Sequence, residues 1–155
     1  MIPQISNGVE AFKQATMNRI ANAAIGGLKA ENVLERDEDP AIVAESIEFF
    51  PVVYVLPIGD QPIHVDNTMG DGTVRVAYTQ EIIGYYATLE KVPQENLPLY
   101  RGYALQTAAL FAGRDNLAFE RGVVVSQEGK VGYFGVADYI IYKFLISQKI
   151  ELVVL

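Results

Sequence analysis

The sequence predicts an α+β domain, with a mostly antiparallel β-sheet and two main helices packed on one face. Two segments have the 3.6-residue apolar periodicity of helices, and several others have the alternation or β-branched apolar runs of strands. Neighbouring strands can pair through hairpin connections. No G-x-G-x-x-G or P-loop occurs at a strand-to-helix turn, which argues against a nucleotide-binding α/β fold. At 155 residues we expect a single domain covering 1–155.

The two helices are expected at about residues 8–25 and 97–111. In the first, apolar residues recur at helical spacing, and Gly26 and its glycine neighbour supply a stop. In the second, Pro98 is expected in the first turn, where proline is tolerated, and Gly113 follows the end.

The first strands are expected at Phe50–Leu56, an apolar and β-branched run, and at Thr73–Ile83, where apolar and polar residues alternate. Gly84 is expected to interrupt the second of these as a bulge. Two shorter strands, 122–126 and 130–134, flank a glycine-bearing triplet and predict a hairpin turning at residues 127–129.

The last strand is expected at residues 136–146, where both faces are largely apolar. Each face therefore needs a cover, one from the helices and one from another element. The chain ends on an apolar tail, residues 150–155, which would be an aggregation hazard in water. We expect this tail to add to the edge of a sheet, either its own or a neighbour's.

A long loop, residues 57–72, is expected between the first two strands. It has neither helical nor alternating pattern, and it contains the single histidine of the chain, His64, with several aspartates and glycines. Structureless loops longer than about 12–15 residues are uncommon unless they bind something or are disordered. We therefore expect this loop to be a docking or lumen-facing element.

Composition excludes several functions. The net charge of −7 and the pI near 4.7, with scattered Lys and Arg, argue against a general nucleic-acid binder. The absence of cysteine excludes disulfides and cysteine zinc sites, and one histidine excludes a histidine-rich site. No signal peptide or membrane-length apolar run is visible, so we expect a soluble protein made in a cytoplasm.

No catalytic residue, metal ligand or cofactor site is nominated. His64, with Asp60, Asp66 and Asp71 nearby, could be a metal or acid–base site, but an ordinary polar loop is favoured because no orienting partner is evident. The segment 66–71 lacks the glutamate that closes an EF-hand. Asp138, a charge within an apolar strand, either pairs with an arginine or faces water.

The element order resembles that of the tail-terminator (tail-completion) proteins of long-tailed bacteriophages. Four features carry the resemblance: an N-terminal helix, a Phe50-Pro-Val-Val-Tyr-Val strand entering a loop, the strand 73–83 before the helix 97–111, and closing strands ending in Asp138-Tyr-Ile-Ile-Tyr-Lys-Phe144. The resemblance implies a non-enzymatic virion protein, assembled in the host cytoplasm. The longer 57–72 loop and the apolar C-terminal tail of this chain depart from the pattern of that family.

By this resemblance the chain would form a homo-hexameric ring through its sheet edges, capping the tail tube and meeting the head-side connector. DNA would only pass through the lumen, and no membrane would be involved. We expect the contacts to lie in the loop and near the C-terminus, at Asp60, Pro62, His64, Asp66, Met69, Asp71, Asp138, Tyr139, Leu152 and Val154.

Three alternatives stay open. One is another neck role, that of a head-completion or stopper protein. The second is a small-ligand-binding regulatory α+β domain, in which the loop closes over an apolar pocket. The third is an enzyme that uses His64 with Asp60 or Asp66.

Overall fold

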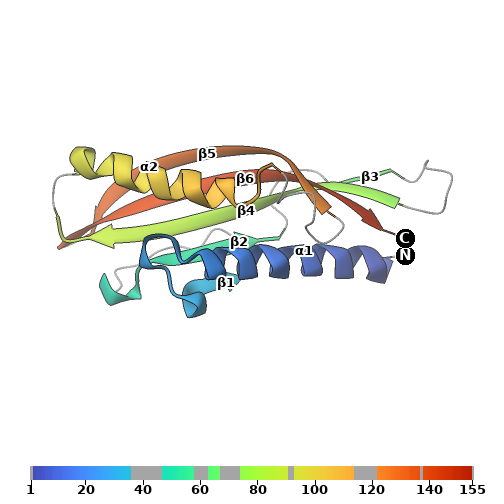
Figure 1. Cartoon of the computed structure of the whole chain (residues 1–155), viewed down its shortest axis with the longest axis horizontal. Coiled ribbons are helices and arrows are strands. Elements are labelled where there is room, and N and C mark those ends of the chain that lie inside the picture. Colours follow the sequence, from blue (N-terminus) through green and yellow to red (C-terminus); the bar gives the residue numbers. More distant parts are fainter. Residues whose placement is uncertain are drawn as a thin grey trace.

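The computed structural model describes residues 2–35, 47–57, 63–66, 74–90, 93–113, 122–136 and 138–154. Figure 1 shows the elements in these ranges. In chain order they are α1 (Ile2–Ala23), η1 (Ile25–Gly27), η2 (Ala30–Asn32), β1 (Val33–Glu35), η3 (Ile47–Phe49), β2 (Val52–Leu56), β3 (His64–Asp66), β4 (Val74–Thr88), α2 (Pro93–Ala109), β5 (Gly122–Val136) and β6 (Tyr139–Val154).

Within the described residues, six strands form one sheet in the order β1-β2-β4-β6-β5, and β3 also pairs with β4. The β1–β2 pair is parallel and every other pair is antiparallel. β2 pairs with residues 81–85 of β4, and β3 pairs with residues 75–77 of the same strand. β2 and β3 therefore lie on the same side of β4. The predicted α+β class with a mostly antiparallel sheet is confirmed.

Both helices begin earlier than the sequence pattern predicts. α1 starts at Ile2, with a proline at its second residue, where the missing N–H costs no hydrogen bond. It ends where Ala24, Gly26 and Gly27 adopt positive φ. α2 starts at Pro93, so that Pro98 lies inside the helix and not in its first turn.

The predicted hairpin around residues 127–129 is wrong. β5 runs without a turn from Gly122 to Val136, and those three residues pair with Gln148, Ser147 and Ile146 of β6. The chain turns instead between Val136 and Tyr139. β5 continues through residues 127–129 because β6 is longer than expected. β6 extends through residues 147–154, so β5 has a pairing partner along its full length.

The predicted bulge at Gly84 is also wrong. β4 passes through this residue in regular register, with Gly84 opposite Phe144 of β6. A Cβ atom placed at Gly84 would lie 2.2 Å from the Phe144 ring. The glycine is needed because the aromatic ring occupies the space of its missing side chain.

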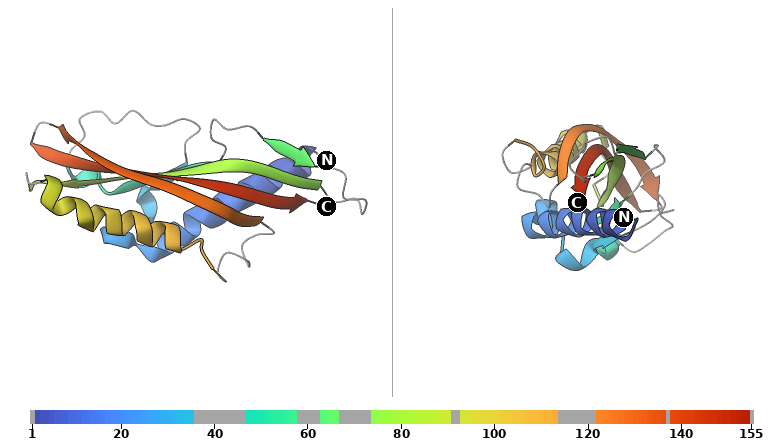
Figure 2. Two further views of the ribbon diagram at one scale, coloured as in Figure 1. Left: turned by 90° about the horizontal axis from the view of Figure 1, so that it is seen from above. Right: turned by 90° about the vertical axis from the view of Figure 1, so that its right-hand side faces the viewer.

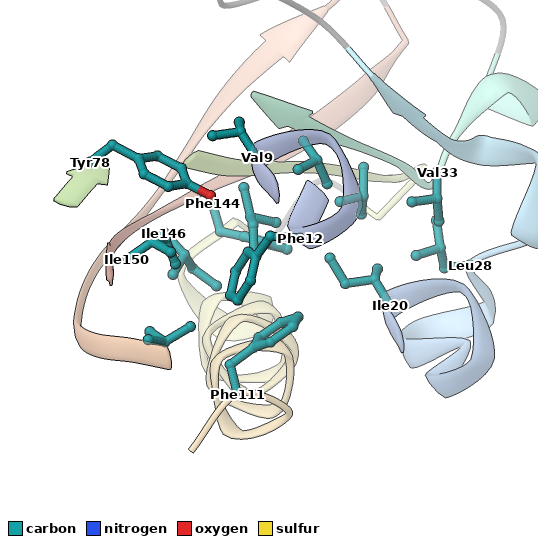
Figure 3. Close-up of a cluster of buried hydrophobic side chains, with 14 of the residues drawn as sticks. Val9, Phe12, Ile20, Leu28, Val33, Tyr78, Phe111, Phe144, Ile146 and Ile150 are labelled. Atoms are coloured by element: carbon teal, nitrogen blue, oxygen red, sulfur yellow. The ribbon is translucent and has the colours of Figure 1, made fainter. Parts of the chain in front are cut away.

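The larger core lies between the sheet and the two helices. Figure 2 shows α1 and α2 along the same side of the long, twisted strands. Phe12 and Ile20 of α1 are almost fully buried against Ile146 and Ile150 of β6, together with Phe111 beyond the end of α2. Figure 3 shows these side chains converging from α1, from the segment after α2 and from the sheet. Burial on this face fixes both helices to the sheet.

A row of three glutamines crosses the middle of this apolar face. Gln80, Gln148 and Gln127 stand at matching register on β4, β6 and β5. Gln80 Nε2 donates to Gln148 Oε1 (3.0 Å), and Gln148 Nε2 donates to Gln127 Oε1 (2.9 Å). At the two ends, Gln80 Nε2 donates to Thr16 Oγ1 of α1 (3.0 Å), and Gln127 Nε2 donates to the Ala108 carbonyl of α2 (2.9 Å). This glutamine row therefore links the helices through the sheet.

Tyrosines attach α2 to the far half of the sheet. The rings of Tyr100 and Tyr142 stack with centroids 3.9 Å apart at 11°. The Tyr142 hydroxyl donates to the Pro93 carbonyl (3.0 Å), and the Tyr86 hydroxyl donates to the Ile25 carbonyl (2.7 Å). Each ring thus supplies apolar area while its hydroxyl caps an otherwise buried main-chain carbonyl.

The opposite face of the sheet carries a second, smaller core. It joins β2, β4 and β6 side chains such as Tyr54, Ile83 and Ile141, against which Ile47 and Phe49 of η3 pack. Among the described residues, the short 3-10 turn η3 is therefore the element outside the sheet that covers this second face.

Candidate assembly surface

β5 presents a long unpaired side. In the part of the chain that the structure describes, its only strand partner is β6, and it stands last in the sheet. After an irregularity at Val125, the pairing with β6 runs unbroken from Ser126. We call the opposite side of residues 126–135 the β5 edge. Ten residues of strand span roughly 33 Å, and such a row of unpaired N–H and C=O groups is a template for another chain.

One groove lies between this edge and α2. It has a volume of about 370 Å³ and is lined by Arg101 and Leu105 of α2 and by Glu128, Lys130 and Val131 of β5. Leu105 is 71 % exposed, more than any other large apolar side chain in the described residues. This helix-side groove therefore combines apolar and charged side chains.

A second groove lies on the other side of the same edge. It has a volume of about 430 Å³ and is lined by Lys130, Tyr133, Phe134, Lys143 and Leu145. The two aromatic side chains are 40 % and 39 % exposed. Aromatic side chains in such positions are typical of protein interfaces.

Side chains of this second groove, which we call the outer groove, pack against rings of β4 and β6. The Tyr133 ring lies 5.8 Å from the Tyr142 ring, and the Lys143 ammonium lies 5.6 Å from the centre of the Tyr85 ring. Burial raises the pKa of Tyr142, whose hydroxyl donates to the Pro93 carbonyl. The surface is therefore pre-formed, which lowers the entropy cost of binding a partner.

The predicted loop residues divide into two groups. Asp60, Pro62, Met69 and Asp71 lie outside the described residues. His64 and Asp66 belong to β3, a short strand within the segment expected as one loop, where they pair with Ala77 and Arg75 of β4.

The side chain of His64 is exposed and lines a hollow of about 300 Å³ with Tyr78, Val125 and Lys149. Its neighbours Ile63 and Val65 are 49 % and 56 % exposed. This end of the molecule therefore offers a second, smaller apolar surface.

The C-terminal residues lie differently from expectation. Residues 150–154 do not form a tail at a sheet edge but are the end of β6, which lies between β4 and β5. Leu152 is 2 % exposed and Tyr139 is 8 % exposed, so both are core side chains. Val154 pairs with Val74, and Asp138 is exposed in the turn between β5 and β6.

Two features are absent from the described ranges. These ranges contain no cluster of three His, Cys, Asp or Glu side chains placed to hold a metal ion. None of their helices is long and apolar enough to cross a membrane.

Sequence reasoning missed the most exposed part of this surface. Leu105, Val125 and Phe134 were not singled out, and the misplaced hairpin divided β5 in two. The composition of residues 127–129 predicts a turn, and no local signal shows that the strand continues through them to pair with β6.

Comparison with known proteins gives similarities among solved structures. No family model matches the sequence, and no curated protein matches it. Among solved structures, the fold is similar to a chain from the virion of a native gene transfer agent particle. The TM-score is 0.49 and the sequence identity is 15 %, over 92 % of this chain and 96 % of that chain.

Proposed function

We propose that this protein is a structural component of a phage virion that forms a ring, with the role of a tail terminator. The observation that carries the proposal is the open β5 edge with a groove on each side. A pre-formed surface of this kind is suited to binding another protein chain.

The order of elements supports the tail-terminator role. α1 precedes β2, β4 precedes α2, and β5 and β6 close the chain. These are the four features on which the sequence resemblance rests. A tail terminator forms a homo-hexamer that caps the tail tube and meets the head-side connector, and these are the partners we propose.

The physical need to cover β5 supports a closed assembly. A long, flat, partly apolar edge strand promotes open-ended aggregation unless something covers it. A ring covers the edge in every copy, because each subunit contacts the next through the same pair of surfaces and no end remains.

Charge supports the passage of DNA without binding. The chain carries −7 net charge, so a ring of six copies would repel phosphate along its lumen. We propose that the segment around β3, with exposed Ile63 and Val65, docks onto the tube or the connector. The predicted contacts Asp60, Pro62, His64, Asp66, Met69 and Asp71 belong to that segment.

The assembly is tested by light scattering and negative-stain imaging of the purified protein. The expected result is a ring, lost in the variants Leu105→Asp and Phe134→Asp, which change one exposed side chain in each groove. Leu89→Asp is the matched control, since Leu89 is 64 % exposed but lines neither groove. A monomer at all micromolar concentrations contradicts the proposal.

The terminator role needs a second readout. The ring is mixed with tail tubes assembled from the tube protein of the same phage and imaged. Binding to one tube end supports the role. Rings that bind the head-side connector but no tube end contradict it and favour the head-completion (stopper) alternative.

A further inference from the structure

We infer that Gln127 is the positioning residue of the assembly surface. Its side chain holds β5 as one continuous strand beside α2, and a chain without it folds but assembles poorly. The inference rests on the proposed ring and names the residue on which the shape of the ring-forming surface depends.

The local sequence of β5 opposes a continuous strand at this point. Gln127, Glu128 and Gly129 have the composition of a hairpin turn. They follow directly after the pairing irregularity at Val125, where one extra residue enters β5. Such a bulge is a place where a strand bends or its pairing ends. The stretch 125–129 therefore needs a tertiary contact to keep it extended.

Packing supplies little of that contact. Among the described side chains of β5, Val124 alone is buried, and Val131 packs against the core from a half-buried position. Three glycines, at positions 129, 132 and 135, have no side chain to pack. A strand with so little apolar burial specifies its register weakly and is prone to slip.

Gln127 supplies the missing contact through both ends of its amide. Its Oε1 accepts from Gln148 Nε2 (2.9 Å), and its Nε2 donates to the Ala108 carbonyl (2.9 Å). In the described chain, no other side chain of the β5 edge hydrogen bonds to an element behind it. A slip by one residue would turn Gln127 to the other face of the sheet and break both bonds. These two bonds therefore favour the observed register.

The bond to Ala108 also sets the shape of the helix-side groove. Ala108 lies in the last turn of α2, where main-chain carbonyls lack partners within the helix. Leu105 precedes it by one turn, and all three residues line this groove. Gln127 thus fixes how closely the end of α2 approaches β5, and with it where the exposed Leu105 side chain stands.

Ring association of two variants tests the inference. Gln127→Met removes both bonds and keeps the length of the side chain. Gln148→Leu removes one of them from a residue that is 0 % exposed and so cannot touch a partner. Each is expected to weaken ring association about tenfold in light scattering, at a temperature where thermal melting shows that the variant is folded.

Tyr86→Phe is the matched control for a general loss of stability. It removes a hydrogen bond of similar kind, which joins β4 to η1 and does not involve β5. Its ring association is expected to equal that of the wild type. An equal loss in this control overturns the inference. So does an unchanged association of Gln148→Leu, because Gln127 would then act by touching the partner and not by positioning β5.

Hydrogen exchange of the dissociated protein gives a second measurement. Amides of residues 126–135 that pair with β6 are expected to exchange faster in Gln127→Met and Gln148→Leu than in the wild type, because β5 is held less firmly. Amides shared by β2 and β4 should keep their rates. Weakened assembly without faster exchange in residues 126–135 overturns the inference.

The outcomes separate this inference from the proposed function. A wild-type protein that forms no ring overturns both. A wild-type ring that forms equally well in Gln127→Met and Gln148→Leu overturns the inference and leaves the ring proposal standing.

Discussion

Replacing Gln148 with leucine is predicted to destabilise the protein by about 2 kcal/mol. Gln148 is the centre of the glutamine row and is fully buried. Leucine has similar size, so the packing is nearly conserved and the effect reports on hydrogen bonding. The free energy of unfolding is the quantity that should change.

The magnitude follows from the two partners left behind. Gln80 is fully buried and keeps its hydrogen bond to Thr16, but its second Nε2–H loses its acceptor, which costs about 1–3 kcal/mol for an unsatisfied buried donor. Gln127 is only half-buried, so water can replace the donor that its Oε1 loses, at about 0–1 kcal/mol. Burial of the leucine side chain offsets roughly 1 kcal/mol.

Chemical denaturation and thermal melting measure this change. About 2 kcal/mol corresponds to a fall in melting temperature of roughly 4–8 °C for a chain of this length. Gln106→Leu is the matched control, because Gln106 is exposed on α2 and should change stability by no more than about 0.5 kcal/mol.

A triple variant sharpens the test. Replacing all three glutamines of the row by leucine removes the polar partners together, so its cost should be well below the sum of the single costs. Two results would refute the reasoning: a Gln148→Leu variant as stable as the surface control, or a triple variant whose cost equals that sum.

Three further predictions concern single contacts. Gly84→Ala should lower the free energy of unfolding by about 1–3 kcal/mol, because the added Cβ overlaps the Phe144 ring. Phe144→Leu in the same chain should recover part of this loss. Gly132→Ala is the control, and it should be near neutral in chemical denaturation because a Cβ at that position meets open space. Burial lowers the pKa of Lys13, but hydrogen bonds and charge from its two glutamate partners outweigh this and raise it above 10.5. The stability that Lys13 contributes is therefore fully present below pH 10.5 and is lost as pH rises through its higher folded-state pKa. Lys13→Met should flatten the fall in the free energy of unfolding at alkaline pH. An unchanged slope in the pH titration would contradict this. Tyr86→Phe removes the hydrogen bond to a buried carbonyl and should lower unfolding free energy by about 1 kcal/mol in denaturant titration, a prediction that a wild-type midpoint would exclude.

The fold class could be predicted because periodicity records which face of each element is buried. Val74, Val76 and Tyr78 alternate on β4, and all three are core residues in the structure. Strand ends were less predictable, because they depend on partners distant in sequence. Gly84 suggests a bulge locally, yet the Phe144 ring of β6 explains it, and β6 lies sixty residues further along the chain.

The assembly surface was harder to predict than the fold. Gln127, Glu128 and Gly129 have turn composition, but Gln148 and the Ala108 carbonyl hold Gln127 in a continuous strand. Only that continuity creates the long β5 edge. The predicted contact Leu152 was chosen as part of an apolar tail, whereas β4 and β5 enclose its strand on both sides.

Hydrogen exchange along β5 tests the central claim most directly. Exchange is compared between the assembled protein and the protein dissociated by dilution. The account predicts that amides within residues 126–135 gain protection on assembly, because the partner covers the β5 edge. Amides of β4 and β6 opposite one another, such as Ile82 and Ile146, should change little since they are already paired. Assembly with no gain of protection in residues 126–135 would contradict the account.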